Sequence, residues 1–297
     1  MSRIGFAGLG NMGGRMARRL HDAGHEVLGY DVARGRAEEL GLVPCLTIAE
    51  AASVEALFLS VPSSREVEEL LDGKNGVLAT GSEGLVVIDM STSEAASTRR
   101  LAAAGEERGI ALLDAPISGG PKPADEGTLT IMVGGDAEAL ERVRPLLEEL
   151  GSSVHHLGAS GNGHVAKAVN NFLNSVNLAA AAEAMVVGVK SGLEPRQLVD
   201  VINGSSGRSF ATEVRFAAIL QGDYQEGALR ADLMAKDLDV YLQLVAQEKT
   251  PTFLAAPSLG VYELAIEHGH GASPANRVVD VLGDMAGGIR MQRDDGQ

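Results

Sequence analysis

The chain has 297 residues, of which 45% are hydrophobic and 22% are charged. This length and composition suffice for a large buried core and predict a globular protein of about two domains. The net charge of −15, without any block of lysine and arginine, argues against nucleic acid or an anionic membrane as a partner. The single cysteine, Cys45, excludes an internal disulfide framework and a multi-cysteine metal site, and we expect no metal.

The N-terminus, "MSRIGFAGLG", runs straight into a structural pattern and lacks the features of a signal peptide. The long apolar stretch after residue 163 is interrupted by asparagines and by Glu183, so we do not expect it to span a membrane. We therefore expect a soluble, cytoplasmic protein.

Short β-rich runs alternate with helical segments up to about residue 160. Alternation of this kind predicts a mostly parallel, doubly wound α/β sheet. After residue 162 the strand signals end, and Ala- and Leu-rich helical patterns follow. We therefore predict an α/β domain over residues 1–162 and an all-helical substrate or oligomerisation domain over residues 163–297. The expected strands are 3–8, 26–30, 56–60, 85–90, 111–115, 128–135 and 152–158.

The first strand leads into "GLGNMGGRMARRL", in which Gly8, Gly10 and Gly13 form the pattern G-x-G-x-x-G at the start of a helix. This context is typical of a dinucleotide-binding turn. Gly8 permits a tight turn, Gly10 lets the backbone approach a pyrophosphate, and Gly13 permits close packing of the helix, whose N-terminus stabilises the phosphate charge. A structural glycine turn is the less favoured alternative.

The second strand is followed by Asp31, 23 residues after Gly8, close to the position expected for an acid that binds the adenosine ribose. Its carboxylate would repel a 2′-phosphate, which favours NAD over NADP. Arg34 and Arg36 follow closely and could bind that phosphate, so NADP remains possible.

A second motif, "DAPISGGPKPADEGTLTIMVGG", places Ser118, Gly119 and Gly120 past the end of a predicted strand. A hydroxyl followed by two glycines can present N–H donors to a carboxylate. The alternative is a plain loop stiffened by Pro116 and Pro121.

The helical stretch that follows carries an unusual polar stripe. Counting from Lys167, the four asparagines Asn170, Asn171, Asn174 and Asn177 stand at i+3, i+4, i+7 and i+10. These offsets place all five side chains on one side of a helix. A buried amide without a partner costs about 1–3 kcal/mol, so the stripe must face something polar. A lysine that extends from a core helix to water would explain Lys167 alone; Asn174 and Asn177 could pair across a helix interface.

Four ordered motifs together resemble the β-hydroxyacid dehydrogenase family, which includes hydroxyisobutyrate dehydrogenase and tartronate semialdehyde reductase. They are "GLGNMGGRMARRL", "DAPISGGPKPADEGTLTIMVGG", "GNGHVAKAVNN" and "KDLDV". The resemblance covers nearly the whole chain and implies a Rossmann-type N-terminal domain, a helical C-terminal domain joined to it by one long helix, a cleft between the two domains, and a homodimer or homotetramer. Arg19 departs from the family, which often carries Asn near the end of its first helix.

The resemblance also implies residue roles. Lys167 corresponds to the catalytic lysine and Asn171 to its companion. The substrate carboxylate is expected at Ser118, Gly119 and Gly120, and Lys236 is expected near the nicotinamide, in reach of substrate and cofactor. The expected cofactor contacts are Gly8, Leu9, Gly10, Asn11, Met12, Gly13, Asp31, Val61, Pro62, Ser91 and Thr92.

The expected activity is hydride transfer between a nicotinamide cofactor and a small β-hydroxy acid or its semialdehyde or keto acid. The cofactor supplies hydride only, and Lys167 would act as general acid and base. Two alternatives remain: an imine or ketone reductase on the same scaffold, and a nucleotide-sensing protein without catalysis. The presence of both the Ser118 motif and Lys167 disfavours the reductase. The intact pair Lys167 and Asn171, together with the absence of any appended recognition domain in the sequence, disfavours the nucleotide sensor.

Overall fold

The computed structural model describes residues 1–225 and 229–292. Contacts within the chain define two compact units, Met1–Lys167 and Ala168–Gln297. The division falls inside one continuous helix, α9 (Asn162–Lys190), which therefore contributes to both units.

The first unit contains a six-stranded parallel sheet with the order β3-β2-β1-β4-β5-β6. This strand order is that of a doubly wound dinucleotide-binding fold, the fold class that the sequence predicted; the two-residue edge strand Val43–Pro44 was not predicted. All six strands are parallel, so the segments that follow them start at the same edge of the sheet. The order reverses between β1 and β4, and at such a point a sheet of this kind binds its ligand. The strands are β1 (Arg3–Ala7), β2 (Glu26–Tyr30), β3 (Val43–Pro44), β4 (Ala56–Leu59), β5 (Val86–Asp89) and β6 (Ala111–Asp114).

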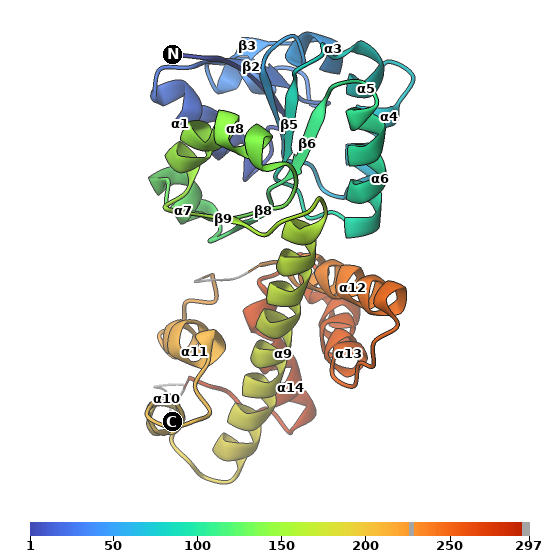
Figure 1. Ribbon diagram of the computed structural model, residues 1–297. Helices are drawn as coiled ribbons and strands as arrows, with labels where there is room; N and C mark the ends of the chain where they lie inside the picture. Colours follow the sequence, from blue (N-terminus) through green and yellow to red (C-terminus); the bar gives the residue numbers. More distant parts are fainter. Residues whose placement is uncertain (226–228, 293–297) are drawn as a thin grey trace. The chain divides into compact units, whose positions relative to one another are not determined.

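The central strands are continuous apolar runs because helices cover both faces of the sheet. In β4, Phe58 packs into the cluster that contains Met16 of α1, whereas Leu57 and Leu59 pack into the cluster that contains Val67 of α4. Figure 1 shows α1, α7 and α8 on one side of the sheet and α4, α5 and α6 on the other. The helices of this unit are α1 (Gly13–Asp22), α2 (Arg36–Glu39), α3 (Ile48–Ala51), α4 (Ser64–Asp72), α5 (Val77–Thr80), α6 (Ala95–Glu106), α7 (Pro121–Glu126) and α8 (Ala137–Leu150).

Two of the predicted strands lie outside the main sheet. A second sheet of three strands has the order β7-β8-β9, with β7 (Ile117–Ser118), β8 (Thr130–Val133) and β9 (Ser153–His156). The antiparallel pair of β7 and β8 was not predicted, because two residues after a proline carry no readable alternation.

The second unit consists of helices in the residues that are described. They are α9 (Asn162–Lys190, from residue 168), α10 (Pro195–Asn203), the π-helical turn η1 (Ala211–Arg215), α11 (Phe216–Ile219), α12 (Ala231–Glu248), α13 (Ala255–Ala265), the π-helical turn η2 (Ile266–His270), the 3₁₀ turn η3 (Ala275–Arg277) and α14 (Val278–Met285). Their core joins Leu178 and Met185 of α9 to Leu238 of α12 and Tyr262 of α13, all of them fully buried.

By length and composition alone, α9 could cross a membrane. The core helix of a soluble protein passes the same test, and α9 contributes several side chains to the core of the second unit.

Candidate active site

The glycine-rich turn between β1 and α1 has room only for glycine at two positions. A Cβ on Gly8, whose φ is +89°, would lie 2.2 Å from the carbonyl oxygen of Ser60, and one on Gly13 would lie 1.9 Å from the carbonyl oxygen of Gly8. Gly10 differs, because nothing lies within 4 Å of the position of its Cβ. The turn is therefore closed on its inner side and open at Gly10, where a pyrophosphate needs access.

Asp31 is fixed against this turn. It directly follows β2, and its carboxylate accepts hydrogen bonds from the N–H groups of Leu9 at 2.6 Å and Ala33 at 2.8 Å. Each carboxylate oxygen keeps further acceptor capacity. The structure thus brings together the glycine turn and the acidic residue expected to bind the ribose.

An open cavity of about 700 Å³ adjoins the same turn at Gly10 and Asn11. Its walls also include Arg15, Arg18, Arg19 and Arg36. Arg36 is already engaged, because its Nε donates to the carbonyl oxygen of Leu9 at 3.0 Å and its Nη1 to Glu39 at 2.9 Å.

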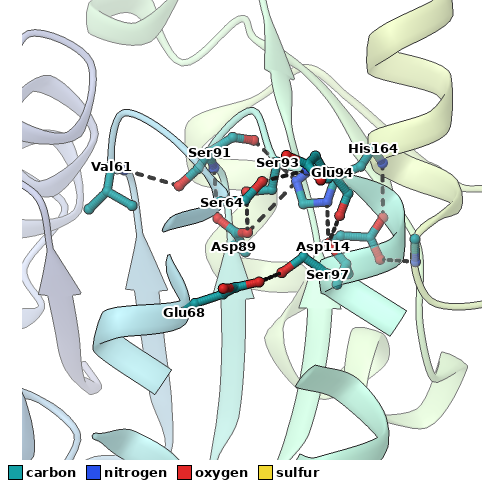
Figure 2. Close-up of polar contacts among 12 residues, drawn as sticks. Val61, Ser64, Glu68, Asp89, Ser91, Ser93, Glu94, Ser97, Asp114 and His164 are labelled. Atoms are coloured by element: carbon teal, nitrogen blue, oxygen red, sulfur yellow. Dashed lines mark hydrogen bonds and ion pairs between the residues drawn. The ribbon is translucent and has the colours of Figure 1, made fainter. Parts of the chain in front are cut away.

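The segments after β4 and β5 are joined by a buried serine. The N–H of Val61 donates to Ser91 Oγ at 3.0 Å, and the N–H of Ser91 donates to Asp89 Oδ1 at 2.9 Å (Figure 2). Ser91 and Asp89 are 4% and 1% exposed. Thr92 is half-buried and Pro62 is exposed. Val61 and Ser91, both expected at the cofactor, therefore lie in contact.

Ser118 ends the short strand β7 and is half-buried. The next two residues need glycine, since φ is +139° at Gly119 and +81° at Gly120. A Cβ on Gly119 would lie 2.8 Å from Pro123 Cβ, whereas Gly120 faces open space. Pro123 belongs to α7, so this loop is packed against the helix that follows it.

Arg19 acquires a structural role here. Its guanidinium donates to the carbonyl oxygen of Asp125 at 3.0 Å and to that of Glu149. These carbonyls stand in the last turns of α7 and α8, where backbone acceptors lack helical partners. Arg19 therefore satisfies two helix C-termini at once, which gives this departure from the family pattern a consequence.

In the second unit, Asn171 is held by a carboxylate that the sequence analysis did not single out. Its Nδ2 donates to Asp237 Oδ2 at 2.6 Å, and the two residues are 7% and 6% exposed. Lys236 Nζ lies 3.4 Å from the other oxygen of Asp237. The motif "KDLDV" was the available signal, because Asp237 follows Lys236 directly in it.

Two family models match the chain almost end to end. The NAD-binding domain of 6-phosphogluconate dehydrogenase matches residues 3–158. The NAD-binding domain of NADP-dependent 3-hydroxyisobutyrate dehydrogenase matches residues 161–282.

The chain is also similar to individual dehydrogenases of known activity or structure. The chain is 37% identical to 2-(hydroxymethyl)glutarate dehydrogenase of Eubacterium barkeri over 96% of both chains. It is 38% identical to NAD-dependent L-serine dehydrogenase of Pseudomonas aeruginosa over 91% of this chain and 94% of that one. The solved structure of Mycobacterium tuberculosis 3-hydroxyisobutyrate dehydrogenase with L-serine is 33% identical, with a TM-score of 0.88 over 95% of this chain and 99% of that chain.

The chain belongs to the β-hydroxyacid dehydrogenase family. It is thus an oxidoreductase that uses NAD(P) and acts on the CH–OH group of hydroxy acids. The open Gly10, the fixed Asp31 and the joined segments at Val61 and Ser91 fit this cofactor.

The asparagines of the stripe on α9 form hydrogen bonds with different partners in this dehydrogenase. Asn170 is exposed, Asn171 bonds to Asp237, and Asn174 Oδ1 accepts from Arg215 Nη2 at 3.0 Å. Arg215 is 2% exposed, and burial lowers its pKa. Asn174 therefore pairs across a helix interface, which confirms for this residue the structural alternative given above.

Proposed function

We propose that this β-hydroxyacid dehydrogenase interconverts a small β-hydroxy acid and the corresponding semialdehyde, with Lys167 as general acid and base. When bound, the nicotinamide accepts or supplies the hydride. The hydroxyl proton needs a separate group, and a lysine can carry it within hydrogen-bond reach. The observation that carries this proposal is the pair Lys167 and Asn171, one turn apart on the unbroken helix α9.

Asn171 is proposed to orient the lysine or the substrate hydroxyl. The bond to Asp237 supports this role, because it engages the amide nitrogen of Asn171 and thereby fixes the direction of the amide oxygen. Lys236, beside the same carboxylate, is proposed as a contact for substrate and nicotinamide.

Ser118, Gly119 and Gly120 are proposed to hold the substrate carboxylate. The compounds in the relatives' names, 2-(hydroxymethyl)glutarate, L-serine and 3-hydroxyisobutyrate, share one core: a carboxylate whose α-carbon carries a CH₂OH group. We propose that the substrate of this chain contains that core. The α-carbon of these compounds carries one further group, which is a methyl, an amino or a longer acidic group. Which of these groups the substrate of this chain carries is to be decided by the assay.

NAD is proposed as the preferred cofactor. The Asp31 carboxylate, fixed beside Leu9, would repel a 2′-phosphate, and Arg36 is engaged with Leu9 and Glu39. The cofactor contacts proposed are those of the glycine turn (Gly8 to Gly13), Asp31, Val61, Pro62, Ser91 and Thr92.

A homodimer or homotetramer in the cytoplasm is proposed as the working state. Helix α9 supports the assembly, because Val169, Leu173 and Val187 are 42%, 53% and 65% exposed. Exposed apolar side chains at helical spacing are typical of a surface that another chain covers. We also propose residue 162, where α9 begins, as the functional domain boundary.

The proposal is tested by turnover with NAD and NADP on 3-hydroxyisobutyrate, L-serine and 2-(hydroxymethyl)glutarate, and on a cyclic imine. Lys167→Ala should lower kcat on the best hydroxy acid by roughly 10²–10⁴-fold. Activity on the imine alone would instead support an imine reductase. Tight NAD binding without any turnover would support a nucleotide sensor.

A further inference from the structure

The first turn of α9 is held by a buried carboxylate at the end of β6. Asp114 is fully buried, and its Oδ1 accepts from the N–H of Gly161 at 2.7 Å while its Oδ2 accepts from the N–H of His164 at 3.0 Å (Figure 2). The first N–H groups of a helix have no partner within the helix, and negative charge is favourable there. A Cβ on Gly163 would lie 2.3 Å from the carbonyl oxygen of Met132, so the turn is also in close contact with β8. The start of α9 is therefore anchored to two strands of the first unit.

The side chain of His164 anchors the same turn to two further elements. It is 2% exposed; its Nδ1 lies 2.8 Å from Thr98 Oγ1 on α6, and its Nε2 donates to the carbonyl oxygen of Ser91 at 3.2 Å. Asp89 Oδ2 lies 3.8 Å from Nε2. The ring is enclosed, and both of its nitrogens have partners.

Ser91 connects this histidine to the segment after β4. Its carbonyl accepts from His164 while its hydroxyl accepts from the N–H of Val61. Figure 2 shows the resulting path from Val61 through Ser91 to the histidine ring on α9. Both Val61 and Ser91 are proposed cofactor contacts, so His164 joins the proposed cofactor side of the first unit to α9.

Lys167 stands three residues after His164 on the same helix and in the same unit, about 4.5 Å further along the helix axis. A rotation or shift of the first turn would move both residues together. Misplacement of a reacting group by 1 Å can cost about 10²-fold in rate. The position of Lys167 relative to Ser91 therefore depends on the contacts of His164 and Asp114.

We infer that His164 is a positioning residue of this dehydrogenase, which sets the place of Lys167 by joining the first turn of α9 to Ser91 and Thr98. The inference rests on the proposed role of Lys167. A buried histidine with a purely structural role would stabilise the unit without changing the turnover of folded enzyme.

The test compares His164→Leu, which loses both contacts, with His164→Gln, whose amide can still donate to the Ser91 carbonyl. His25→Leu is the matched control, because His25 is also a largely buried histidine of the first unit, paired with Glu149 rather than with α9. The full-length enzyme is measured for kcat, for KM of NAD and of the hydroxy acid, for thermal midpoint, and for hydrogen–deuterium exchange of residues 161–167.

We expect His164→Leu to lower kcat at least about tenfold, with the KM for NAD changed less than threefold, and to speed exchange in the first turn of α9. His164→Gln should recover part of kcat, and His25→Leu should lower the thermal midpoint only. Wild-type kcat in His164→Leu, or an equal loss in His25→Leu, would overturn the inference. If Lys167→Ala keeps its turnover, the proposed acid–base role fails and the inference with it; an impaired Lys167→Ala beside an unimpaired His164→Leu marks failure of the inference alone.

Discussion

Removal of the Asp237 carboxylate should lower both the stability and the turnover of the enzyme. Its carboxylate accepts the Asn171 amide at 2.6 Å, with both residues more than nine-tenths buried. Hydrogen bonds to charged groups contribute about 1.5–3 kcal/mol, and a buried amide left without its partner adds a desolvation cost. We therefore expect Asp237→Ala to lower the free energy of unfolding by about 2–3 kcal/mol, and kcat by about tenfold, because Asn171 loses its fixed orientation. Asp237→Asn keeps an acceptor but not the charge, and should lose about half as much stability.

Urea denaturation followed by circular dichroism gives the first quantity, and steady-state kinetics gives the second. Asp239→Ala is the control, since Asp239 lies two residues further on α12 but is exposed; it should change the free energy of unfolding by less than about 0.5 kcal/mol. Equal stabilities for Asp237→Ala and Asp239→Ala would refute the energetic reasoning. Unchanged kcat in a destabilised Asp237→Ala would refute the orienting role of Asn171.

The remaining predictions concern the cofactor, the substrate carboxylate and the proton. The Asp31 carboxylate should give NAD at least a tenfold advantage over NADP in kcat/KM, about 1.4 kcal/mol, and equal efficiencies would show that the nearby arginines dominate. Ser118→Ala should raise the KM of the hydroxy acid while leaving the KM of NAD nearly unchanged; damage mainly to NAD binding would place this loop at the cofactor instead. Lys167→Arg should lose most turnover at pH 7, because a guanidinium does not release its proton, and a pH–rate profile like that of the wild type would contradict proton transfer by this residue.

The sequence by itself was sufficient to predict the main architecture, a parallel α/β sheet followed by helices. Apolar runs such as "ALFL" and "VVID", separated by helical patterns, predicted the parallel sheet, and the three glycines predicted the turn between β1 and α1. These signals are readable because each depends on neighbours within a few residues: side-chain periodicity and the φ values that only glycine adopts. The helix that carries Lys167 and Asn171 was predicted for the same reason.

Only the tertiary structure decided which polar groups meet. Asn171 and Asp237 are 66 residues apart, His164 and Asp114 are 50 apart, and Arg19 and Glu149 are 130 apart. Nothing in the local pattern distinguishes a buried aspartate or histidine from one on the surface, because the difference lies in partners supplied by remote segments. The cost of burying an unpaired polar group enforces such pairs once the chain is folded. Their identity is set by packing between strands and helices, which local periodicity does not encode.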